Sequence, residues 1–381
     1  MIKLAVLGST GSVGTQTLQV VEKFKEEVEI TALVAKRASE KLLHQVIRFK
    51  PKIVVSYEIP SKQWLSYLPS ETEYLHGDSG LTEAVRISDR VMNAIGGVSG
   101  IKPTNVILKE KKILLASNKE SIICLGDIVK KNRELIIPVD SEHSALFQLM
   151  HCVNREEIKC VYITASGGPF KDWSLEEMKK ATVEQALKHP RWNMGAKITV
   201  DSATLMNKGF EMLEAVNLFN LDMEKVKVVI HPESSVHGAV QLKDGTFLMH
   251  VGKTDMRIPI TYAVFYPQRK NYPFGETSLL SLSPLHFEEV DESKFKAISL
   301  VRTVSKKGGA YIPALVGADE ESVDLFLKGK IGFLDIVPMV ERVLEKVNIP
   351  APKTVEEILF TVEWARKQVK EIYEKEYAKV G

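Results

Sequence analysis

The chain has 381 residues, a length that predicts about two or three domains, each with its own hydrophobic core. Its 51 lysine and arginine residues and 49 aspartate and glutamate residues give a net charge of +2. This balance lacks the basic surplus typical of proteins that bind nucleic acids or anionic membranes, so neither is expected as a partner. Hydrophobic residues make up 44% and charged residues 26% of the chain, which excludes a disordered or fibrous protein.

Cysteine usage and the first residues predict a cytoplasmic protein. Cys124, Cys152 and Cys160 are odd in number and lack the spacing of a disulfide framework or a zinc site. Met1 leads directly into an apolar segment without the pattern of a signal or transit peptide. No apolar run reaches the roughly 18 residues of a membrane-spanning helix.

The first 140 residues alternate short apolar runs with longer amphipathic ones. Nearly continuous apolar runs are typical of parallel strands that helices cover on both faces. We therefore expect an α/β fold with an N-terminal doubly wound (Rossmann-like) parallel sheet, because the spacing leaves room for a helix after each strand. Its strands are predicted at residues 3–8, 29–35, 52–56, 90–95, 112–117 and 134–139.

Beyond residue 140 the pattern is mixed and rich in Gly, Ser, His and Pro, which is typical of an active-site domain. Strands are predicted there at residues 158–164, 226–230 and 245–251. After a proline-rich connector, helices are predicted at residues 293–305, 320–327, 336–347 and 354–378. The expected division is a first domain over 1–139, a central α+β domain over 140–266, a connector over 267–290 and a small all-helical C-terminal domain over 291–381.

A glycine-rich segment follows the first predicted strand and opens the first predicted helix. Small residues there let the backbone approach a pyrophosphate, and the helix N-terminus supplies N–H groups and positive dipole. The GxxGxxG spacing predicts a dinucleotide site, although glycines also make plain strand-to-helix turns. Lys36 and Arg37 end the second strand, where NAD-binding proteins carry an acidic residue, so NADP is favoured over NAD. The alternative is that the two cations belong to a solvated loop. The segment reads Gly8-Ser9-Thr10-Gly11-Ser12-Val13-Gly14.

Two acidic clusters suggest a cation site. Asp140 and Glu142 follow the strand at 134–139, and their hard oxygen atoms suit Mg²⁺ or Mn²⁺, but the same residues would also cap and complement a helix that begins at Ser144. Glu211 adds a third carboxylate at the end of the segment 201–211. On one helix face, Lys208 and Glu211 would form a surface ion pair, whereas Ser202, Asn207 and Lys208 would together suit a phosphate.

Two loops combine flexibility with hydrogen-bond donors. The segment Thr164–Phe170 is either a phosphate loop or a Gly-Pro turn. The segment His189–Gly195 carries Trp192 and Met194, which would pack on a core or belong to a lid that excludes water.

These segments together resemble the 1-deoxy-D-xylulose 5-phosphate reductoisomerase family. The resemblance spans essentially the whole chain and is most specific over residues 189–211. The segments that carry it are Gly8–Gly14, Ala116–Ser121, Pro138–Ala145, Ser166–Phe170, His189–Glu211, His231–Ser234 and Asp255–Arg257.

The resemblance implies roles for individual residues. Lys119, Asp140, Glu142 and Glu211 would be catalytic, the three carboxylates as ligands of the divalent cation and Lys119 beside the metal and the nicotinamide. The implied substrate-binding residues are Ser141, Glu142, Ser166, His189, Trp192, Ser202, Asn207, Lys208 and Glu211, and residues 187–196 would form a mobile lid. The implied cofactor-binding residues are Gly8, Thr10, Gly11, Ser12, Val13, Ala35, Lys36, Arg37, Asn118, Lys119, Glu120, Gly195 and Met256.

The family isomerises 1-deoxy-D-xylulose 5-phosphate and reduces the product with NADPH to 2-C-methyl-D-erythritol 4-phosphate, in the non-mevalonate route to isoprenoid precursors. The resemblance therefore implies NADPH and Mg²⁺ or Mn²⁺ as cofactors, a small phosphorylated sugar as substrate and a homodimer. Two other interpretations compete with it. A semialdehyde dehydrogenase would need an activated catalytic cysteine, and a non-catalytic nucleotide sensor would not need three carboxylates and a phosphate cluster.

Overall fold

The computed structural model describes residues 1–189, 191–192 and 195–378, and the chain divides into two compact units. Unit 1 comprises residues 1–147 and 255–276, and unit 2 comprises residues 148–254 and 277–381. The division into four segments with boundaries at residues 139, 266 and 290 stays a prediction.

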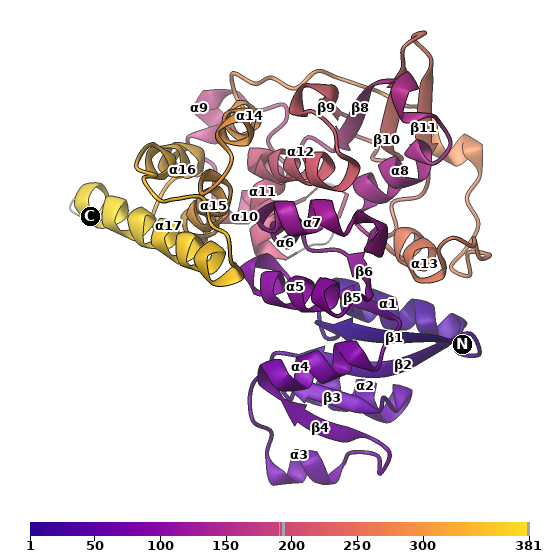
Figure 1. Ribbon diagram of the computed structural model, residues 1–381. Coiled ribbons are helices and arrows are strands. Elements are labelled where there is room, and N and C mark those ends of the chain that lie inside the picture. Colours follow the sequence, from indigo (N-terminus) through magenta and orange to yellow (C-terminus); the bar gives the residue numbers. More distant parts are fainter. Residues whose placement is uncertain (190, 193–194, 379–381) are drawn as a thin grey trace. The chain divides into compact units, whose positions relative to one another are not determined.

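Unit 1 is built on a seven-stranded sheet in the order β4-β3-β2-β1-β5-β6-β7 (Figure 1). Every pairing in it is parallel. The order reverses between β1 and β5, and doubly wound sheets bind ligands at such a switch point. The predicted Rossmann-like sheet is confirmed, with strands β1 (Ile2–Leu7), β2 (Val28–Ala35), β3 (Ile53–Ser56), β4 (Glu73–His76), β5 (Arg90–Asn93), β6 (Ile113–Ala116) and β7 (Ile136–Pro138).

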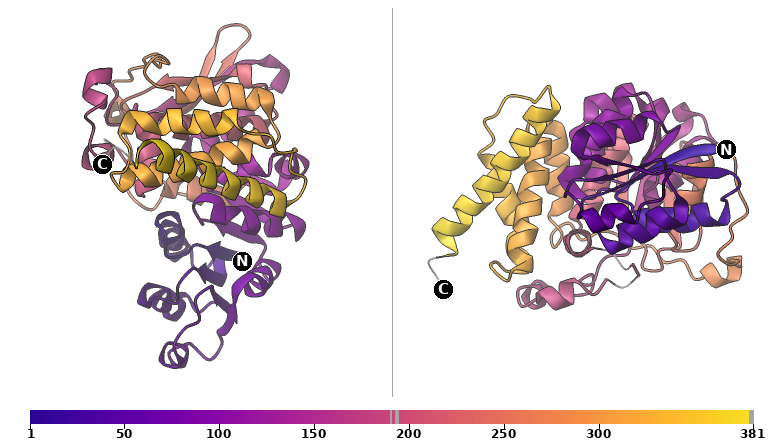
Figure 2. Two further views of the ribbon diagram at one scale, coloured as in Figure 1. Left: turned by 90° about the vertical axis from the view of Figure 1, so that its left-hand side faces the viewer. Right: turned by 90° about the horizontal axis from the view of Figure 1, so that it is seen from below.

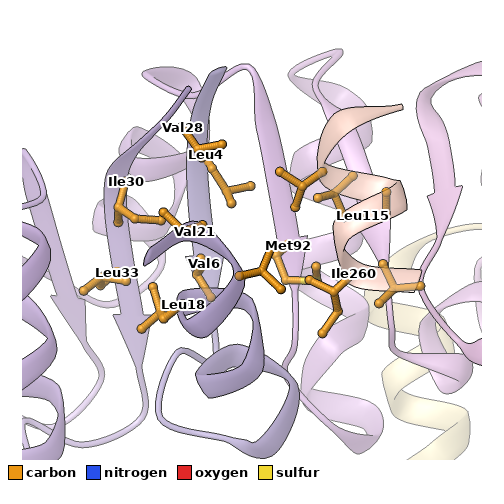
Figure 3. Packing of buried hydrophobic residues seen from close by; sticks show 14 of the residues in the cluster. Leu4, Val6, Leu18, Val21, Val28, Ile30, Leu33, Met92, Leu115 and Ile260 are labelled. Atoms are coloured by element: carbon orange, nitrogen blue, oxygen red, sulfur yellow. The ribbon is translucent and has the colours of Figure 1, made fainter. Parts of the chain in front are cut away.

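The core of unit 1 lies between this sheet and its helices. Leu4 and Val6 of β1 are buried together with Leu18 and Val21 of the first helix and Ile260 of the returning segment (Figure 3). Leu18 and Val21 lie one turn apart, so one stripe of the helix faces the sheet. The helices of unit 1 are α1 (Ser12–Lys23), α2 (Glu40–Phe49), α3 (Lys62–Ser66), α4 (Gly77–Arg86), α5 (Ile101–Lys109), α6 (Lys119–Cys124), α7 (Gly126–Lys131) and α13 (Arg257–Phe265).

Helix α8 (Ser141–Met150) begins in unit 1 and leads the chain into unit 2. Unit 2 contains a four-stranded mixed sheet in the order β11-β10-β8-β9, in which only the pair of β8 and β9 is parallel. Helix α12 packs against β8 and β9. The elements are β8 (Ile158–Ala165), β9 (Val226–Ile230), β10 (Val236–Leu242), β11 (Phe247–Val251), α9 (Leu175–Met178), α10 (Val183–Ala186), α11 (Ala196–Thr204) and α12 (Met206–Phe219).

The C-terminal part of unit 2 is helical, as predicted, and Figure 2 shows its helices side by side. They are α14 (Ala297–Lys307), α15 (Tyr311–Leu327), α16 (Ile336–Glu345) and α17 (Val355–Glu376). Gly317 lets α15 approach α17 closely, because a Cβ at this position would lie 2.3 Å from the carbonyl oxygen of Val362. Within the described residues, no helix has the length and hydropathy needed to cross a membrane.

Candidate active site

The glycine-rich turn of unit 1 joins β1 to α1. Gly8 has a φ of +77°, and its N–H donates to the carbonyl of Val34 at 2.8 Å. A Cβ on Gly14 would lie 2.3 Å from the Gly8 carbonyl oxygen, so the helix approaches the turn at a distance that only glycine permits. Neither a capping side chain nor an acidic residue occupies the start of α1. The first N–H groups of α1 therefore keep their capacity to bind a phosphate.

Three cations follow β2, and one of them contacts the glycine-rich turn. Lys36 and Arg37 follow β2 and are exposed, and Arg37 Nε lies 3.2 Å from Glu58 in an ion pair whose partners are mostly in solvent. Lys41 Nζ donates to the carbonyl of Thr10 at 2.7 Å. Lys41 was not predicted, because it belongs to no sequence motif. Its place at the start of α2 brings it to the glycine-rich segment.

Asn118 and Lys119 follow β6. The Asn118 side chain caps α6 by accepting from the N–H of Ser121 at 2.7 Å, and its amide donates to Glu120 at 3.1 Å. Lys119 is nearly buried, and its ammonium lies 3.0 Å from Asp140 Oδ1. Burying a lysine is unfavourable unless a carboxylate compensates its charge, so this ion pair fixes both side chains.

Asp140 precedes α8, and its carboxylate has a partner on each oxygen. Besides the bond from Lys119 to Oδ1, the fully buried His143 places Nδ1 3.0 Å from Oδ2. Two residues on, Glu142 Oε2 accepts a 2.5 Å hydrogen bond from Ser141 Oγ. The two predicted carboxylates of unit 1 thus lie at one helix start, each oriented by a neighbour. His143 was missed because a lone histidine at a helix start carries no pattern of its own.

A cluster of donors in unit 2 centres on His189. Its Nε2 lies 3.1 Å from both Ser166 Oγ and Ser202 Oγ. Its Nδ1 accepts the backbone N–H groups of Arg191 and Trp192, at 3.1 and 2.9 Å. A neutral imidazole that accepts at Nδ1 carries its proton on Nε2, so one N–H and two hydroxyl groups meet at one point. Such a set of donors suits the oxygens of a phosphate.

The turn after β8 brings Ser166 to this cluster. Gly167 and Gly168 have φ values of +90° and +68°, and the Gly168 N–H donates to Ser166 Oγ at 3.3 Å. The turn rests on the last turn of α11, since a Cβ on Gly168 would lie 2.8 Å from the carbonyl oxygen of Ser202. Both glycines are therefore required by the backbone.

Asn207, Lys208 and Glu211 lie on the first turns of α12. Asn207 Nδ2 donates to Glu211 Oε1 at 2.6 Å, and Lys208 Nζ lies 2.7 Å from Oε2. The Lys208 and Glu211 side chains are only 8% and 1% exposed. The alternative of a solvated surface pair is thus wrong, and Glu211 is a buried carboxylate with both oxygens oriented.

The loop that leads to α11 is partly described. Trp192 is half-buried, and Arg191 Nε donates to the carbonyl of Pro232 at 2.9 Å. Met194, together with positions 190 and 193 of the predicted lid, lies outside the described residues. A pocket of about 610 Å³ opens beside Ser166 and is lined among others by Lys171, Trp173, Lys188 and Arg191.

Two further predicted cofactor residues lie at helix starts. Gly195 is the N-cap of α11 in unit 2, and Met256 is the N-cap of α13 in unit 1. Met256 is held between Asp255 and Arg257, whose side chains form a 2.6 Å ion pair. Within each unit, the structure thus joins Lys119 to Asp140, Ser166 to His189 and Ser202, and Lys208 to Glu211.

The parallel sheet and the glycine-rich turn at its switch point define a dinucleotide-binding α/β protein. Three family models match the chain: 1-deoxy-D-xylulose 5-phosphate reductoisomerase at residues 4–126, the C-terminal domain of the same reductoisomerase at residues 136–219, and the DXP reductoisomerase C-terminal domain at residues 251–368. The chain belongs to the 1-deoxy-D-xylulose 5-phosphate reductoisomerase family, as its sequence resemblance implies.

Relatives and solved structures agree with this assignment. The chain is 63% identical over 380 residues to the reductoisomerase of Aquifex aeolicus, covering 100% of both chains, and 44% identical to that of Persephonella marina, covering 96% and 97%. The reductoisomerase from Zymomonas mobilis in complex with NADPH matches with a TM-score of 0.91 at 36% identity, over 98% and 99% of the two chains. A DOX-P reductoisomerase in complex with NADPH, fosmidomycin and magnesium matches with a TM-score of 0.89 at 34% identity, over 98% of both chains.

Proposed function

We propose how the residues of this chain carry out the reaction of its family. The reaction is the NADPH- and divalent-metal-dependent isomerisation and reduction of 1-deoxy-D-xylulose 5-phosphate to 2-C-methyl-D-erythritol 4-phosphate. The observation that carries the assignment is the 63% identity over the full length of a reductoisomerase. A semialdehyde dehydrogenase or a nucleotide sensor would leave that similarity unexplained.

The glycine-rich turn fits the pyrophosphate of NADPH. A Cβ on Gly8 or Gly14 would collide with backbone atoms, so only glycine keeps this space open. The start of α1 offers N–H groups that no side chain caps. Arg37, with Lys36 and Lys41 nearby, offers positive charge to a 2′-phosphate. When bound, NADPH supplies the hydride for reduction. The proposed contacts are Gly8, Thr10, Gly11, Ser12, Val13, Ala35, Lys36, Arg37, Asn118, Lys119, Glu120, Gly195 and Met256.

Three carboxylates fit a divalent cation, which prefers hard oxygen ligands. We assign Asp140, Glu142 and Glu211 as its ligands, because the family resemblance implies this role for all three carboxylates. When bound, Mg²⁺ or Mn²⁺ supplies a Lewis acid for the substrate oxygens. The residues of the chain prepare the carboxylates for this role. Lys119 and His143 hold Asp140, Ser141 holds Glu142, and Lys208 with Asn207 holds Glu211.

The donors of unit 2 fit the substrate phosphate. His189 Nε2, Ser166 Oγ and Ser202 Oγ converge, and Asn207 and Lys208 add an amide and a positive charge from the start of α12. Contacts with a phosphate that does not react supply binding energy for orienting the reacting carbons. Trp192 would then cover the substrate and exclude water, and Ser141 would contact the hydroxyl region of the substrate.

The proposal includes the oligomeric state of the protein and its cellular compartment. We infer a homodimer, supported by the apolar edge strand β11, in which Phe247 and Met249 are 45% and 41% exposed, and by Leu279 and Leu280, which are more exposed still. A solvated apolar edge invites strand pairing or another covering surface. A reducing cytoplasm suits the exposed thiol of Cys152. Sedimentation equilibrium that gives the mass of a single chain would contradict the dimer.

The central test follows NADPH absorbance in purified protein with 1-deoxy-D-xylulose 5-phosphate and Mg²⁺ or Mn²⁺. Oxidation is expected, and excess chelator is expected to stop it. NADPH binding is measured separately by fluorescence. Protein that binds NADPH but oxidises none of it with either metal would overturn the proposed function.

A further inference from the structure

Lys197 links three helices of unit 2. It stands in the first turn of α11, and its Nζ lies 2.6 Å from Asp201 Oδ2 of the same helix and 2.7 Å from Asp319 Oδ2 of α15. The same Nζ lies 4.9 Å from the ring centroid of Phe210 in α12. The Asp201 and Asp319 side chains are buried, at 4% and 0% exposed, whereas the Lys197 side chain is 27% exposed. The reaction described above makes no use of this cluster.

The cluster holds two carboxylates for one ammonium. Burial raises the pKa of Asp319, and the nearby Lys197 opposes this rise. The charged groups that face Asp319 are Lys197, Asp201 and Glu320, of which Glu320 is paired with Arg366. Lys197 compensates the charge of only one carboxylate, so a second buried negative charge is unfavourable there.

Helix α11 carries part of the phosphate cluster. Asp201 directly precedes Ser202, whose hydroxyl lies 3.1 Å from His189 Nε2. The turn that carries Ser166 rests on the backbone of Ser202 through Gly168. The position of α11 therefore decides where both hydroxyl groups of the cluster lie. The contact of Lys197 with Asp319 is a charged attachment of α11 to α15.

We propose that Lys197 and Asp319 are positioning residues for the substrate phosphate. They fasten α11 to α15 and thereby keep Ser202 and the Ser166 turn at hydrogen-bond distance from His189. Neither residue is among those proposed to contact the substrate, the cofactor or the metal. The identity of the ligand as a phosphorylated sugar rests on the proposed function, whereas the effect on a phosphate group depends on unit 2 alone.

Two substitutions of Asp319 test the anchor. Asp319→Ala removes it but leaves Lys197 and Asp201 as a balanced pair, so the fold is expected to survive. Asp319→Asn keeps the size of the side chain and an oxygen that can accept a hydrogen bond from Lys197 Nζ, so it is expected to rescue function. Affinity for inorganic phosphate is measured by calorimetry, KM for 1-deoxy-D-xylulose 5-phosphate by NADPH oxidation, and affinity for NADPH by fluorescence.

Asp319→Ala is expected to weaken phosphate affinity and to raise KM for the substrate by about tenfold, because small displacements of a converging donor set are costly. Asp319→Asn should stay within about twofold of the wild type, and NADPH affinity should not change in either variant. Lys197→Met should match or exceed the effect of Asp319→Ala. The matched control is Lys328→Met, which breaks an exposed Lys–Asp pair with the same i,i+4 spacing and should change none of these values.

The outcomes separate this inference from the proposed function. Wild-type protein that binds phosphate but does not oxidise NADPH with the substrate would refute the proposed function and leave the anchor to be judged by phosphate affinity. The anchor is refuted if Asp319→Ala binds phosphate like the wild type, if Asp319→Asn is as impaired as Asp319→Ala, or if NADPH affinity falls equally. A wild-type protein without measurable phosphate binding also refutes it.

Discussion

Gly14→Ala tests the close approach of α1 to the glycine-rich turn that follows β1. The new Cβ would lie 2.3 Å from the Gly8 carbonyl oxygen and 2.7 Å from Ser9 Cα, whereas ordinary contacts begin near 3.4 Å. Because the obstructing atoms are backbone, α1 must move by about 1 Å from the turn. Overpacking of this kind costs about 1–3 kcal/mol of stability, and the better helix propensity of alanine returns up to about 1 kcal/mol.

The free energy of NADPH binding should decrease by more than the free energy of unfolding. A displacement of about 1 Å at a binding site reduces function by about 100-fold, and the displaced groups are the N–H donors at the start of α1. NADPH affinity is measured by fluorescence titration, and the free energy of unfolding by urea denaturation. Gly252→Ala is the control, because its Cβ would lie 3.9 Å from the nearest side-chain atoms. Gly14→Ala protein that binds NADPH as tightly as the wild type would refute the argument.

Three further predictions concern single side chains. Arg37→Ala should weaken NADPH binding by about tenfold and leave NADH binding nearly unchanged, since only NADPH carries the 2′-phosphate; equal losses in titrations with both would refute the assignment. Ser202→Ala should raise KM for 1-deoxy-D-xylulose 5-phosphate by at least about tenfold without changing NADPH affinity, whereas the exposed Ser299→Ala should change neither. Although burial opposes the shift, hydrogen bonds from His286 lower the pKa of Glu233 from 4.5 to about 2. The stability that Glu233 contributes is therefore complete above about pH 4.5 and is lost as the pH falls toward 2. Glu233→Gln should remove this part of the acid dependence. A Tm difference between the wild type and Glu233→Gln that stays constant from about pH 6 to about pH 2.5 would contradict this prediction.

Strands with apolar runs could be predicted from the sequence, and polar ones could not. The predicted segments 3–8, 29–35 and 90–95 correspond to β1, β2 and β5, which are buried in the middle of the sheet. β4, with the sequence Glu-Tyr-Leu-His, was missed because it is an edge strand without a buried run. β10 was missed as well, since Gly238 interrupts its apolar pattern. Local patterns thus reveal a strand where its residues form an uninterrupted apolar run.

The sequence by itself determined the parts of the site that adjacent residues build. The glycine turn, the cations after β2 and the carboxylates at the start of α8 each lie within a few residues, so their chemistry is visible in the order of the chain. Family resemblance added Lys119, whose contact with Asp140 spans 21 residues. Only the tertiary structure placed His189 between Ser166 and Ser202, Lys41 beside Thr10, and Lys197 against Asp319. These contacts join separate elements, and their distances depend on how helices and sheets pack, which no local pattern encodes.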